Sequence, residues 1–538
     1  MILHALLILA GGGAFLYRRE LHLLRYFQQE EYDSRRFWAW CRAQRAFDRR
    51  GAMIAVPLTI GLAALSPWPT PGLGLGIAGG IGLLNAARTE VDPRQTGKKK
   101  LVLTQRANRI LRTALVGAAL FTVPGALGLL AAGGPLGPAF AWAWLGLMFQ
   151  LAPGFLMLAE RLLAPGEKRI QDGFYQEAKK ILAEVDPTVI GITGSYGKTS
   201  TKMILGELLT ADAPTFWTPK SINTVMGVTR EIRERMKPHH KWAIMEMGAY
   251  NVGSIQRLCD FTPPKAAIIT VVGIMHLERF GSAENVYRAK SELAKNVPAD
   301  GVLVCNGDDP GARRMAKENP KATTLLYGID SEDADCRMTD ITETADGSTF
   351  TVHWKGRAYT GSTGLLGKPM LSNLLGAFTM AAALGVHPDV LLAVVRNIKP
   401  TENRLEVKRV GDVTWINDAY NSNPAGFAAA LAVLREQPAT RRVLVTPGMV
   451  ELGDRQFEEN KKVATEAAKI CDVVLLVGET NRLALAQGLT EGGAKDDAVR
   501  WFARRDDAFA ALGKDTRPGD VILIENDLPD LYEGTVVL

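Results

Sequence analysis

The sequence predicts an α/β protein in which transmembrane helices precede two domains built on mostly parallel sheets. Three observations predict this class. Residues 1–163 contain five apolar stretches, short apolar strands alternate with helical patterns after about residue 167, and a Gly-rich turn joins one such strand to a helix. Alternating strands and helices are typical of parallel sheets, which bind ligands at the carboxyl ends of their strands. A chain of 538 residues is long enough for about three domains.

The N-terminal region is predicted to be a set of membrane-spanning helices. A spanning helix needs roughly 17–25 largely apolar residues. The fourth and fifth apolar stretches meet this length, and the first three are marginal. The five stretches are Ile2–Tyr17, Ala52–Trp68, Leu73–Ala87, Thr113–Ala132 and Leu136–Leu158.

Charge predicts the orientation of this region. Residues 18–50 carry nine arginines and residues 88–112 carry eight lysines or arginines, whereas the connections near 68–71 and 133–137 carry no charge. Under the positive-inside rule both basic segments are cytoplasmic, so five spans give a multi-pass cell-membrane protein with cytoplasmic catalytic domains. Segment 18–50 is expected to lie on membrane lipids as an amphipathic helix, or to be a solvated helix. The alternative for the whole region is a buried helical bundle.

Composition argues against several kinds of partner and site. The net charge of +6 is mild, so we expect no nucleic-acid partner. The five cysteines are scattered without a close pair. This spacing argues against a structural zinc site or a disulfide framework, and it fits a reducing compartment.

A Gly-rich turn between Gly191 and Ser200 indicates a phosphate site. The apolar run Pro187–Ile192 predicts a buried strand, and a helix is expected from Ser200. Glycines let backbone N–H groups converge on an anion at the helix N-terminus, and a lysine neutralises its charge. The spacing differs from the standard Walker A motif, which would have glycine where Ile192 stands. The expected ATP-binding residues of this turn are Gly194, Ser195, Tyr196, Gly197, Lys198, Thr199 and Ser200.

Candidate metal ligands lie at the turn and after the next predicted strands. The Thr199 hydroxyl is placed to ligate Mg²⁺, Glu246 lies at the end of the second strand, and His276 follows the third. Such carboxylates also cap helices, and a lone histidine is more often structural. The predicted strands are Thr188–Thr193, Ala243–Met247, Ala266–Val271, Gly301–Cys305, Thr324–Tyr327, Thr414–Asn417, Arg442–Thr446, Val473–Val477 and Val521–Ile524.

Seven motifs, in this order, resemble those of the Mur ligases. Within that family they are most similar to the ligases that add D-alanyl-D-alanine to the peptidoglycan precursor, and the resemblance covers about residues 185–480. It implies a central ATP-binding domain over 166–400 and a Rossmann-like domain over 401–538, with membrane helices over 1–165 in place of the family's uridine-nucleotide domain. The motifs are Gly191–Thr199, Thr218–Asn223, Met245–Gly248, His276–Ser282, Ala289–Leu293, Asn306–Asp309 and Asp418–Pro424.

The resemblance implies a catalytic centre with ATP and two Mg²⁺ ions. Lys198 would hold the β- and γ-phosphates, Thr199 and Glu246 would ligate one Mg²⁺, and His276 would ligate the second. Lys290 matches a carbamylated lysine, whose anionic oxygens suit a magnesium site. The alternative for Lys290 is a solvated helix residue. Asn223 matches a residue near the phosphates.

The resemblance also implies nucleotide contacts from the later part of the chain. These residues are Asn373, Arg404, Asp418, Tyr420, Asn421 and Asn423. Arg404 would reach the phosphates, and Asp418 would bind the ribose hydroxyls. Two departures stand out. Pro369 and Met370 replace a His-Asn pair, and the acidic segment 525–530 replaces a basic Lys-Gly-Ser-Arg block. The amine substrate therefore stays open, and a cationic amine is one alternative.

The activity implied is ATP-dependent amide bond formation through an acyl phosphate, in peptidoglycan or other cell-envelope precursor synthesis. The partners would be a small-molecule amine and a carboxylate acceptor, either lipid-linked or nucleotide-linked. Two alternatives compete with this function. One is a ligase that polymerises an amino acid, as poly-γ-glutamate synthases do, and the other is a membrane ATPase or regulator without ligase activity.

Overall fold

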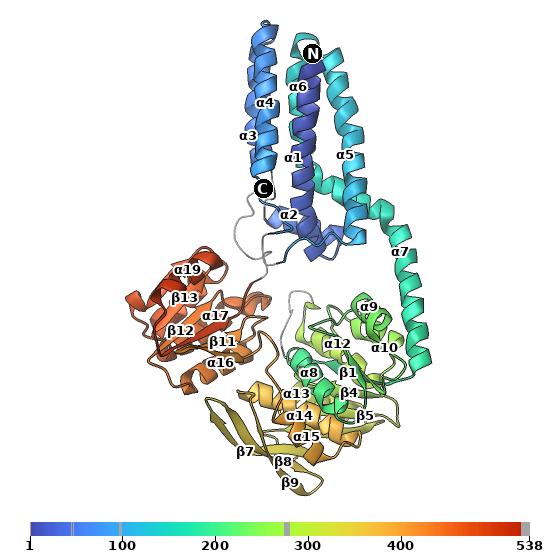
Figure 1. Ribbon diagram of the computed structural model, residues 1–538, viewed down its shortest axis with the longest axis vertical. Coiled ribbons are helices and arrows are strands. Elements are labelled where there is room, and N and C mark those ends of the chain that lie inside the picture. The colour runs from blue at the N-terminus through green and yellow to red at the C-terminus, as the bar shows by residue number, and fades with distance from the viewer. Residues whose placement is uncertain (1, 45, 47, 96–98, 274–279, 529–538) are drawn as a thin grey trace. The chain divides into compact units, whose positions relative to one another are not determined.

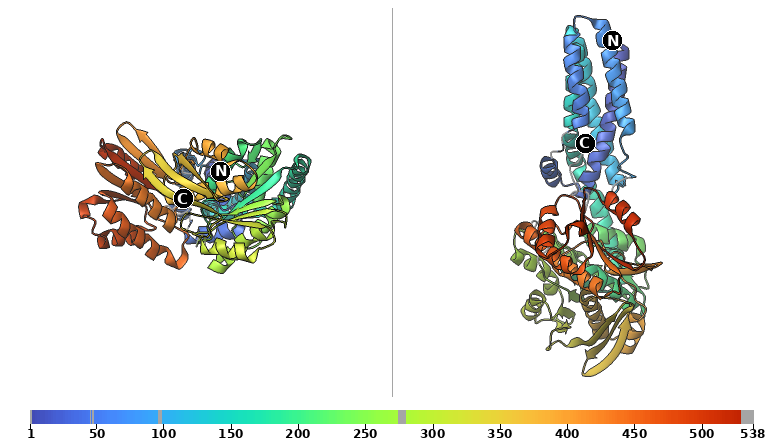
Figure 2. Two further views of the ribbon diagram at one scale, coloured as in Figure 1. Left: turned by 90° about the horizontal axis from the view of Figure 1, so that it is seen from below. Right: turned by 90° about the vertical axis from the view of Figure 1, so that its left-hand side faces the viewer.

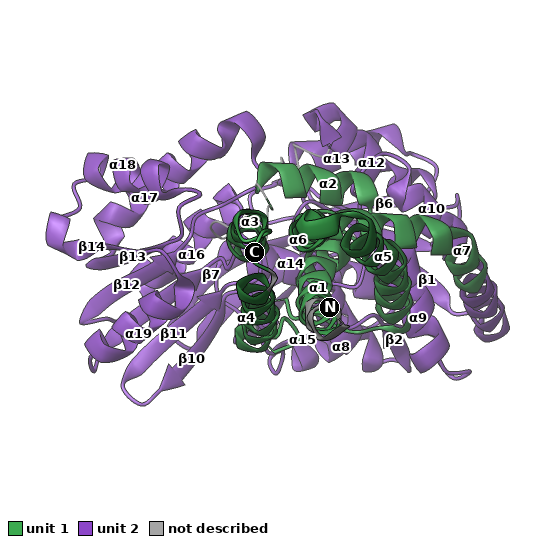
Figure 3. Cartoon of the chain, turned by 90° about the horizontal axis from the view of Figure 1, so that it is seen from above, with its two compact units in different colours: residues 1–171, 529–538 green, residues 172–528 purple. Residues whose placement is uncertain are grey.

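The computed structural model describes residues 2–44, 46, 48–95, 99–273 and 280–528. The chain divides into two compact units, the first holding residues up to Gln171 and the second Asp172–Leu528 (Figure 3).

The first unit is a bundle of long helices (Figure 1). Helix α1 packs against α4 and α5, α3 packs against α4 and α6, and α5 packs against α6. Large side chains such as Phe15, Phe27, Trp142 and Phe149 fill the interior. The helices are α1 (Ile2–Gln29), α2 (Ser34–Ala43), α3 (Arg49–Ala64), α4 (Pro69–Thr89), α5 (Gln105–Ala132), α6 (Gly137–Gln150) and the first part of α7 (Ala152–Val185).

The prediction of five spans in a multi-pass cell-membrane protein is wrong. Within the described residues, α5 is the one helix long and apolar enough to cross a membrane. Residues Gly134–Gln150 and helix α7 meet at a bend of 58°, and they would make a second candidate span only if the two segments crossed a membrane together as one. Helix α3 has only 16 residues, and apolar side chains of α1 and α4 such as Leu24 and Leu83 are buried inside the bundle. The cytoplasmic placement of the catalytic domains was predicted from those spans, so it has no support without them.

The basic segment 18–50 also differs from the expectation of a membrane-surface helix. It forms the end of α1 and then α2, whose Phe37 and Trp40 are buried. The Arg19 side chain is buried and pairs with Asp48 at 2.7 Å and with Glu90 at 3.2 Å. Removing one member of such a buried group of charges would leave an uncompensated charge inside the bundle. The charge of Arg19 is therefore turned inward, whereas Arg35 and Arg42 of the same segment are exposed.

The second unit begins with a nine-stranded sheet among its described residues, in the order β2-β3-β1-β4-β5-β6-β7-β8-β9. Strands β1 to β6 are parallel, and β7 to β9 are antiparallel to one another and extend one edge of the sheet (Figure 2). The strands are β1 (Thr188–Thr193), β2 (Thr215–Trp217), β3 (Trp242–Glu246), β4 (Ala266–Ile269), β5 (Val302–Asn306), β6 (Thr323–Gly328), β7 (Cys336–Thr344), β8 (Gly347–Trp354) and β9 (Arg357–Thr363).

Helices cover this sheet and set the position of its loops. Strands β1 and β3 are apolar and buried along almost their whole length, as strands covered on both faces must be. The end of α7 belongs to this core, because Ala178 and Leu182 are buried there and Tyr175 packs on Phe261. The helices are α8 (Lys198–Thr210), α9 (Val225–Arg235), α10 (Ser254–Phe261), α12 (Ala283–Lys295), α13 (Pro310–Glu318), α14 (Lys368–Ala383) and α15 (Pro388–Val395).

A six-stranded sheet follows in the order β10-β11-β15-β12-β13-β14, again counted over the described residues. Only β10 runs antiparallel to its neighbour, so both sheets confirm the predicted α/β class with mostly parallel strands. Its strands are β10 (Glu406–Val410), β11 (Val413–Asp418), β12 (Arg441–Thr446), β13 (Val473–Val477), β14 (Val499–Phe502) and β15 (Asp520–Glu525). Its helices are α16 (Pro424–Glu436), α17 (Gln456–Ile470), α18 (Arg482–Glu491) and α19 (Arg505–Asp515).

Candidate functional site

The turn between β1 and α8 has the geometry of an anion site. Gly197 precedes the helix with φ 84°, a conformation that favours glycine. A Cβ atom there would also approach the Asn373 Oδ1 atom to 2.3 Å. The first N–H groups of α8 have no partner within the helix, and together with the helix dipole they favour a phosphate.

Lys198 lies over this turn. Its Nζ donates hydrogen bonds to the carbonyl oxygens of Gly194 at 2.7 Å and Ser195 at 3.2 Å. Burial lowers the pKa of Lys198 to about 8; Glu246 opposes this shift, and nearby cations reinforce it. A bound phosphate would favour the charged ammonium.

The rest of the turn is hydrogen-bonded to the segment that follows strand β4. The Ser195 hydroxyl donates to the Gly273 carbonyl oxygen at 2.7 Å, and the Thr270 hydroxyl donates to the Tyr196 carbonyl oxygen at 2.6 Å. Ser200 is buried at the start of α8. Ser195 and Tyr196 are therefore held by hydrogen bonds ahead of α8.

Glu246 is the centre of a buried polar cluster behind the turn. Its Oε2 atom accepts hydrogen bonds from the Thr199 hydroxyl at 2.9 Å and from the Lys202 ammonium at 2.9 Å. Its Oε1 atom accepts from the Asn223 side chain at 3.1 Å. Glu246 is 1% exposed, and the parallel register of β1 and β3, which pairs it with Ile192, places it beside the turn. The predicted Thr199, Glu246 and Asn223 thus come together.

Lys202 is the residue of this cluster that sequence reasoning missed. It is fully buried and also donates to the Thr218 hydroxyl at 3.2 Å. Burial lowers the pKa of Lys202, whereas the Glu246 carboxylate raises it. The available signal was spacing, because residues three apart share one face of a helix and Lys202 follows Thr199 by three positions.

Lys290 is buried on α12, so the alternative of a solvated helix residue does not hold. Burial lowers the pKa of Lys290 well below its usual range, and the like charge of Lys198 lowers it further. His276 lies outside the described residues. Within the described ranges no group of three or more His, Cys, Asp or Glu residues could hold a metal ion. The Thr199 hydroxyl and the Glu246 carboxylate are nevertheless in contact, and they are oxygen donors of the kind Mg²⁺ prefers.

A cavity of about 540 Å³ lies between the two sheets of the second unit. Tyr196, Gly197 and Ser200 border it on one side. The predicted nucleotide residues that line it are Asn373, Arg404, Asp418, Asn421 and Asn423. The Asn423 side chain also caps α16 by accepting from the Gly426 N–H at 3.0 Å, so it has a structural role as well.

Arg404 connects the two halves of the site. Its Nη2 donates to the Thr199 hydroxyl at 3.3 Å, and its guanidinium lies 4.3 Å from the centre of the Tyr420 ring. The Tyr420 hydroxyl forms a hydrogen bond with the Ser221 hydroxyl. Tyr420 therefore joins the two sides of the site, although it does not line the cavity. The next residue, Leu405, donates its N–H to the Asp418 Oδ1 atom at 3.2 Å.

Asp418 combines burial with two stabilising neighbours. Burial raises the pKa of Asp418 to about 6, while the Leu405 N–H and the Arg404 charge lower it. Its carboxylate lines the cavity. A carboxylate in this position can accept hydrogen bonds from two neighbouring hydroxyl groups.

Further cavity residues were not predicted as ligands. Asp308, Asp309 and Lys368 line it, and so do Pro369 and Met370, which replace the expected His-Asn pair. Asp309 also caps α13 and accepts from the Val272 N–H at 3.1 Å. The Asn306–Asp309 motif therefore fixes the loop after β4.

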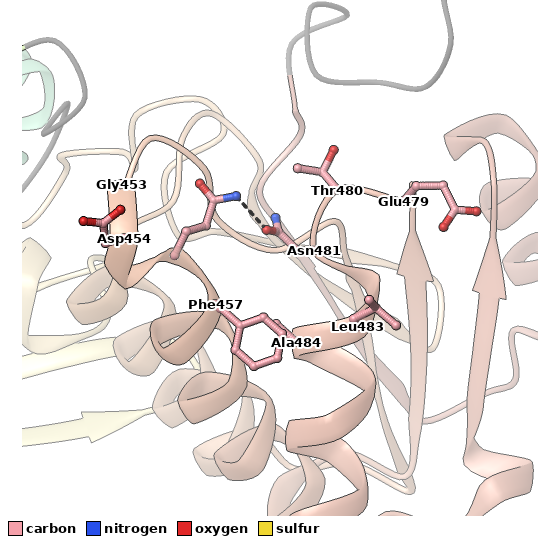
Figure 4. A pocket seen from close by; sticks show the side chains of 9 residues that line it. Gly453, Asp454, Phe457, Glu479, Thr480, Asn481, Leu483 and Ala484 are labelled. Atoms are coloured by element: carbon pink, nitrogen blue, oxygen red, sulfur yellow. Dashed lines mark hydrogen bonds between the residues drawn. The ribbon is translucent and has the colours of Figure 1, made fainter. Parts of the chain in front are cut away.

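Another cavity, of about 410 Å³, is lined by residues that follow strands β12 and β13 of the six-stranded sheet (Figure 4). Glu479 and Thr480 follow β13, Phe457 projects from α17, and Gln456 donates to Asn481 at 3.0 Å. Of the predicted site residues that the structure describes, none lines it.

Comparison with known proteins gives concordant matches. The Mur ligase middle domain matches residues 192–381, and the Mur ligase, glutamate ligase domain matches residues 403–525. UDP-N-acetylmuramoyl-tripeptide–D-alanyl-D-alanine ligase of Mycobacterium tuberculosis is 32% identical over 359 residues, covering 63% of this chain and 70% of that protein. The Bacillus subtilis ligase of the same name is 29% identical, covering 65% and 75%. MurF ligase from Thermotoga maritima in complex with ADP matches in structure with a TM-score of 0.59 and 26% identity, over 66% of this chain and 80% of that chain.

Proposed function

The chain belongs to the Mur ligase family and is an ATP-dependent ligase of peptidoglycan precursor synthesis, and we propose that it joins a carboxylate to an amine through an acyl phosphate. The observation that carries the mechanism is the contact of Thr199 with both Glu246 and Arg404 beside the cavity. One hydroxyl group there contacts both the candidate metal ligand and Arg404, which precedes the six-stranded sheet. Membership of this ligase family also argues against the alternative of a membrane ATPase or regulator without ligase activity.

In the proposed reaction, an oxygen of the acceptor carboxylate attacks the γ-phosphorus of ATP, and the bond between that phosphorus and the β–γ bridging oxygen breaks. Lys198 and the N–H groups of α8 hold the phosphates in line, and Arg404 adds positive charge from the other side. Thr199 and Glu246 would hold Mg²⁺, which supplies a Lewis acid at the phosphate oxygens when bound. The amine nitrogen then attacks the acyl carbon, phosphate leaves, and the nitrogen loses a proton.

Lys290 is proposed to carry a carbamate. Only a neutral amine reacts with CO₂, and the buried Lys290, held near the cation Lys198, favours the neutral form. The carbamate would turn a cationic side chain into an anionic oxygen ligand for the second Mg²⁺, together with His276.

The substrates are proposed from the relatives' names. The two ligases reported above act on a UDP-N-acetylmuramoyl tripeptide and D-alanyl-D-alanine, so a muramoyl peptide carboxylate and a dipeptide amine are the first candidates here. The matched family domains begin at residue 192. Helices α1 to α7 precede them, where the resemblance predicted no uridine-nucleotide domain. The group that carries the acceptor is therefore the variable to test.

A substrate-dependence assay tests this function. ADP formation by the full chain is expected to require both Mg²⁺ and a muramoyl peptide, offered in nucleotide-linked and lipid-linked forms. With the amine omitted and hydroxylamine added, the acyl phosphate is expected to be trapped as a hydroxamate. Lys198→Ala should form neither ADP nor hydroxamate. ADP release without any trapped product or amide would contradict the acyl-phosphate route.

Nucleotide affinity is expected to fall in mild acid. Asp418 accepts hydrogen bonds from both ribose hydroxyls only when ionised, because a proton turns one carboxyl oxygen into a donor. Its pKa of about 6 means that it gains this proton as pH falls through that value. ADP binding should therefore weaken between about pH 7 and 5. Asp418→Asn should bind ADP weakly at neutral pH and lose most of this pH dependence. Calorimetric titration at several pH values measures both effects, and a flat profile in the unaltered protein would contradict the role.

A further inference from the structure

The last strand of the second sheet ends in a buried carboxyl group that the proposed mechanism does not use. Glu525 is fully buried and lies opposite Asp418 in the parallel register of β11 and β15. Side chains opposite each other in neighbouring strands point to the same face, and such strands lie about 4.8 Å apart. The Glu525 carboxyl group therefore lies next to the carboxylate that lines the nucleotide cavity.

Two adjacent carboxyl groups withdrawn from water cannot both be ionised, because the like charges repel each other. The Leu405 N–H and the Arg404 guanidinium favour the charged form of Asp418. Burial raises the pKa of Glu525 well above its usual range, and Asp418 raises it further, while the Ser422 hydrogen bond opposes this. Glu525 is therefore the member of the pair that keeps the proton.

The contacts of Glu525 lead to the loop between β11 and α16. Its Oε1 atom accepts a hydrogen bond from the buried Ser422 hydroxyl. Ser422 stands between Asn421 and Asn423, which both line the cavity. The other oxygen, Oε2, is buried without a hydrogen-bond partner among the described residues, so no donor stabilises a negative charge on it.

Asn526 fixes the same loop from the next position. Its N–H donates to the Asp418 carbonyl oxygen at 3.1 Å, and its side chain donates to the Gly448 carbonyl oxygen at 2.6 Å. Its φ of 65° turns the chain sharply at the end of the strand. The end of β15 therefore contacts the loop between β11 and α16 on the side away from the cavity, through Glu525 and Asn526.

We propose that Glu525 is a positioning residue for nucleotide binding: as a neutral acid it holds Ser422 and so orients the loop Asp418–Asn423 toward the ribose. This inference rests on the proposed function, which puts the nucleotide in the cavity. It also gives Glu525, the first residue of the acidic segment predicted to face the amine, an inward role. Asp527 of that segment pairs with Arg505 at 3.3 Å, so neither described carboxylate offers a free anionic surface to a cationic amine.

ADP titration of the full chain at neutral pH tests the proposal. Glu525→Ala is expected to weaken ADP binding about 10-fold and Ser422→Ala about fivefold, since each removes a buried hydrogen bond. Glu525→Gln should stay within about twofold of the unaltered protein, because an amide is neutral and its oxygen still accepts from Ser422. Asp527→Asn, which removes a carboxylate two positions away, is the matched control and should leave ADP binding unchanged.

The KM values separate this role from general damage to the fold. In Glu525→Ala the KM for ATP should rise while the KM for the amine stays unchanged. A loss of amine affinity in Glu525→Gln with normal ADP binding would overturn the inference in favour of an anionic amine site. Should Glu525→Ala fail to fold, Ser422→Ala carries the test, and normal ADP binding by that variant would overturn the inference. Failure of the unaltered protein to bind ADP would instead refute the proposed function.

Discussion

Replacing Lys290 with alanine is expected to reduce the rate of ligation by about 10²–10³-fold, the usual cost of removing one group that stabilises transition-state charge. Lys290 is buried, and its pKa lies well below the usual range, so it has no role as a surface cation. As a carbamate it would contribute an anionic oxygen at the phosphates. Amide formation measured with saturating ATP, acceptor and amine gives the rate.

A direct signal for the modification accompanies the kinetics. Protein equilibrated with ¹³C-bicarbonate is expected to show a carbamate carbon resonance that disappears in Lys290→Ala. Lys295→Ala is the matched control, because Lys295 lies on the same helix but is exposed. It should keep both the resonance and the rate. Ligation at the normal rate by Lys290→Ala would refute the assignment.

Replacing Lys202 with methionine is expected to lower the free energy of unfolding by about 3–5 kcal/mol, because it leaves a buried charge without its partner. The Lys202 ammonium and the Glu246 carboxylate are 0% and 1% exposed, so water cannot replace the lost contact. The variant should also lose nucleotide-dependent activity, since Glu246 would gain a proton or move. Urea unfolding followed by circular dichroism measures the stability.

A second substitution separates the lost pair from lost packing. The double variant Lys202→Met with Glu246→Gln should recover part of the stability, because the uncompensated charge is gone, but it should remain inactive. Lys469→Met is the control for an exposed pair. Lys469 lies 2.8 Å from Glu466 with both side chains about half exposed, and such pairs contribute about 0–1 kcal/mol. Equal losses in Lys202→Met and Lys469→Met would contradict the buried-pair argument.

Much of the second unit could be predicted from local sequence. Apolar runs bounded by glycine or polar residues gave the central strands to within one or two residues, because strands buried on both faces need such runs. The antiparallel strands β7 to β9 were missed, since their exposed faces interrupt the apolar pattern. At the site, glycine spacing predicted the phosphate turn, and the resemblance supplied the residues that follow it.

Other features depend on contacts that a linear pattern does not contain. Lys202 looks like any helix lysine until the fold places Glu246 against it. The acidic segment that starts at the end of β15 suggested a cationic amine substrate, but the register of β15 beside β11 buries Glu525. The N-terminal region shows the same limit. Apolar stretches alone do not distinguish a helix that faces lipid from one that packs on other helices. Here side chains such as Phe15 and Trp142 pack against other helices of the bundle.

The C-terminal end of α7 offers a practical opportunity. Its Tyr175, Ala178 and Leu182 already belong to the core of the second unit, so a recombinant fragment starting at Asp172 would keep the contacts that its catalytic part needs. Such a fragment should be expressible alone and amenable to crystallisation with nucleotides, without the helical bundle that precedes it.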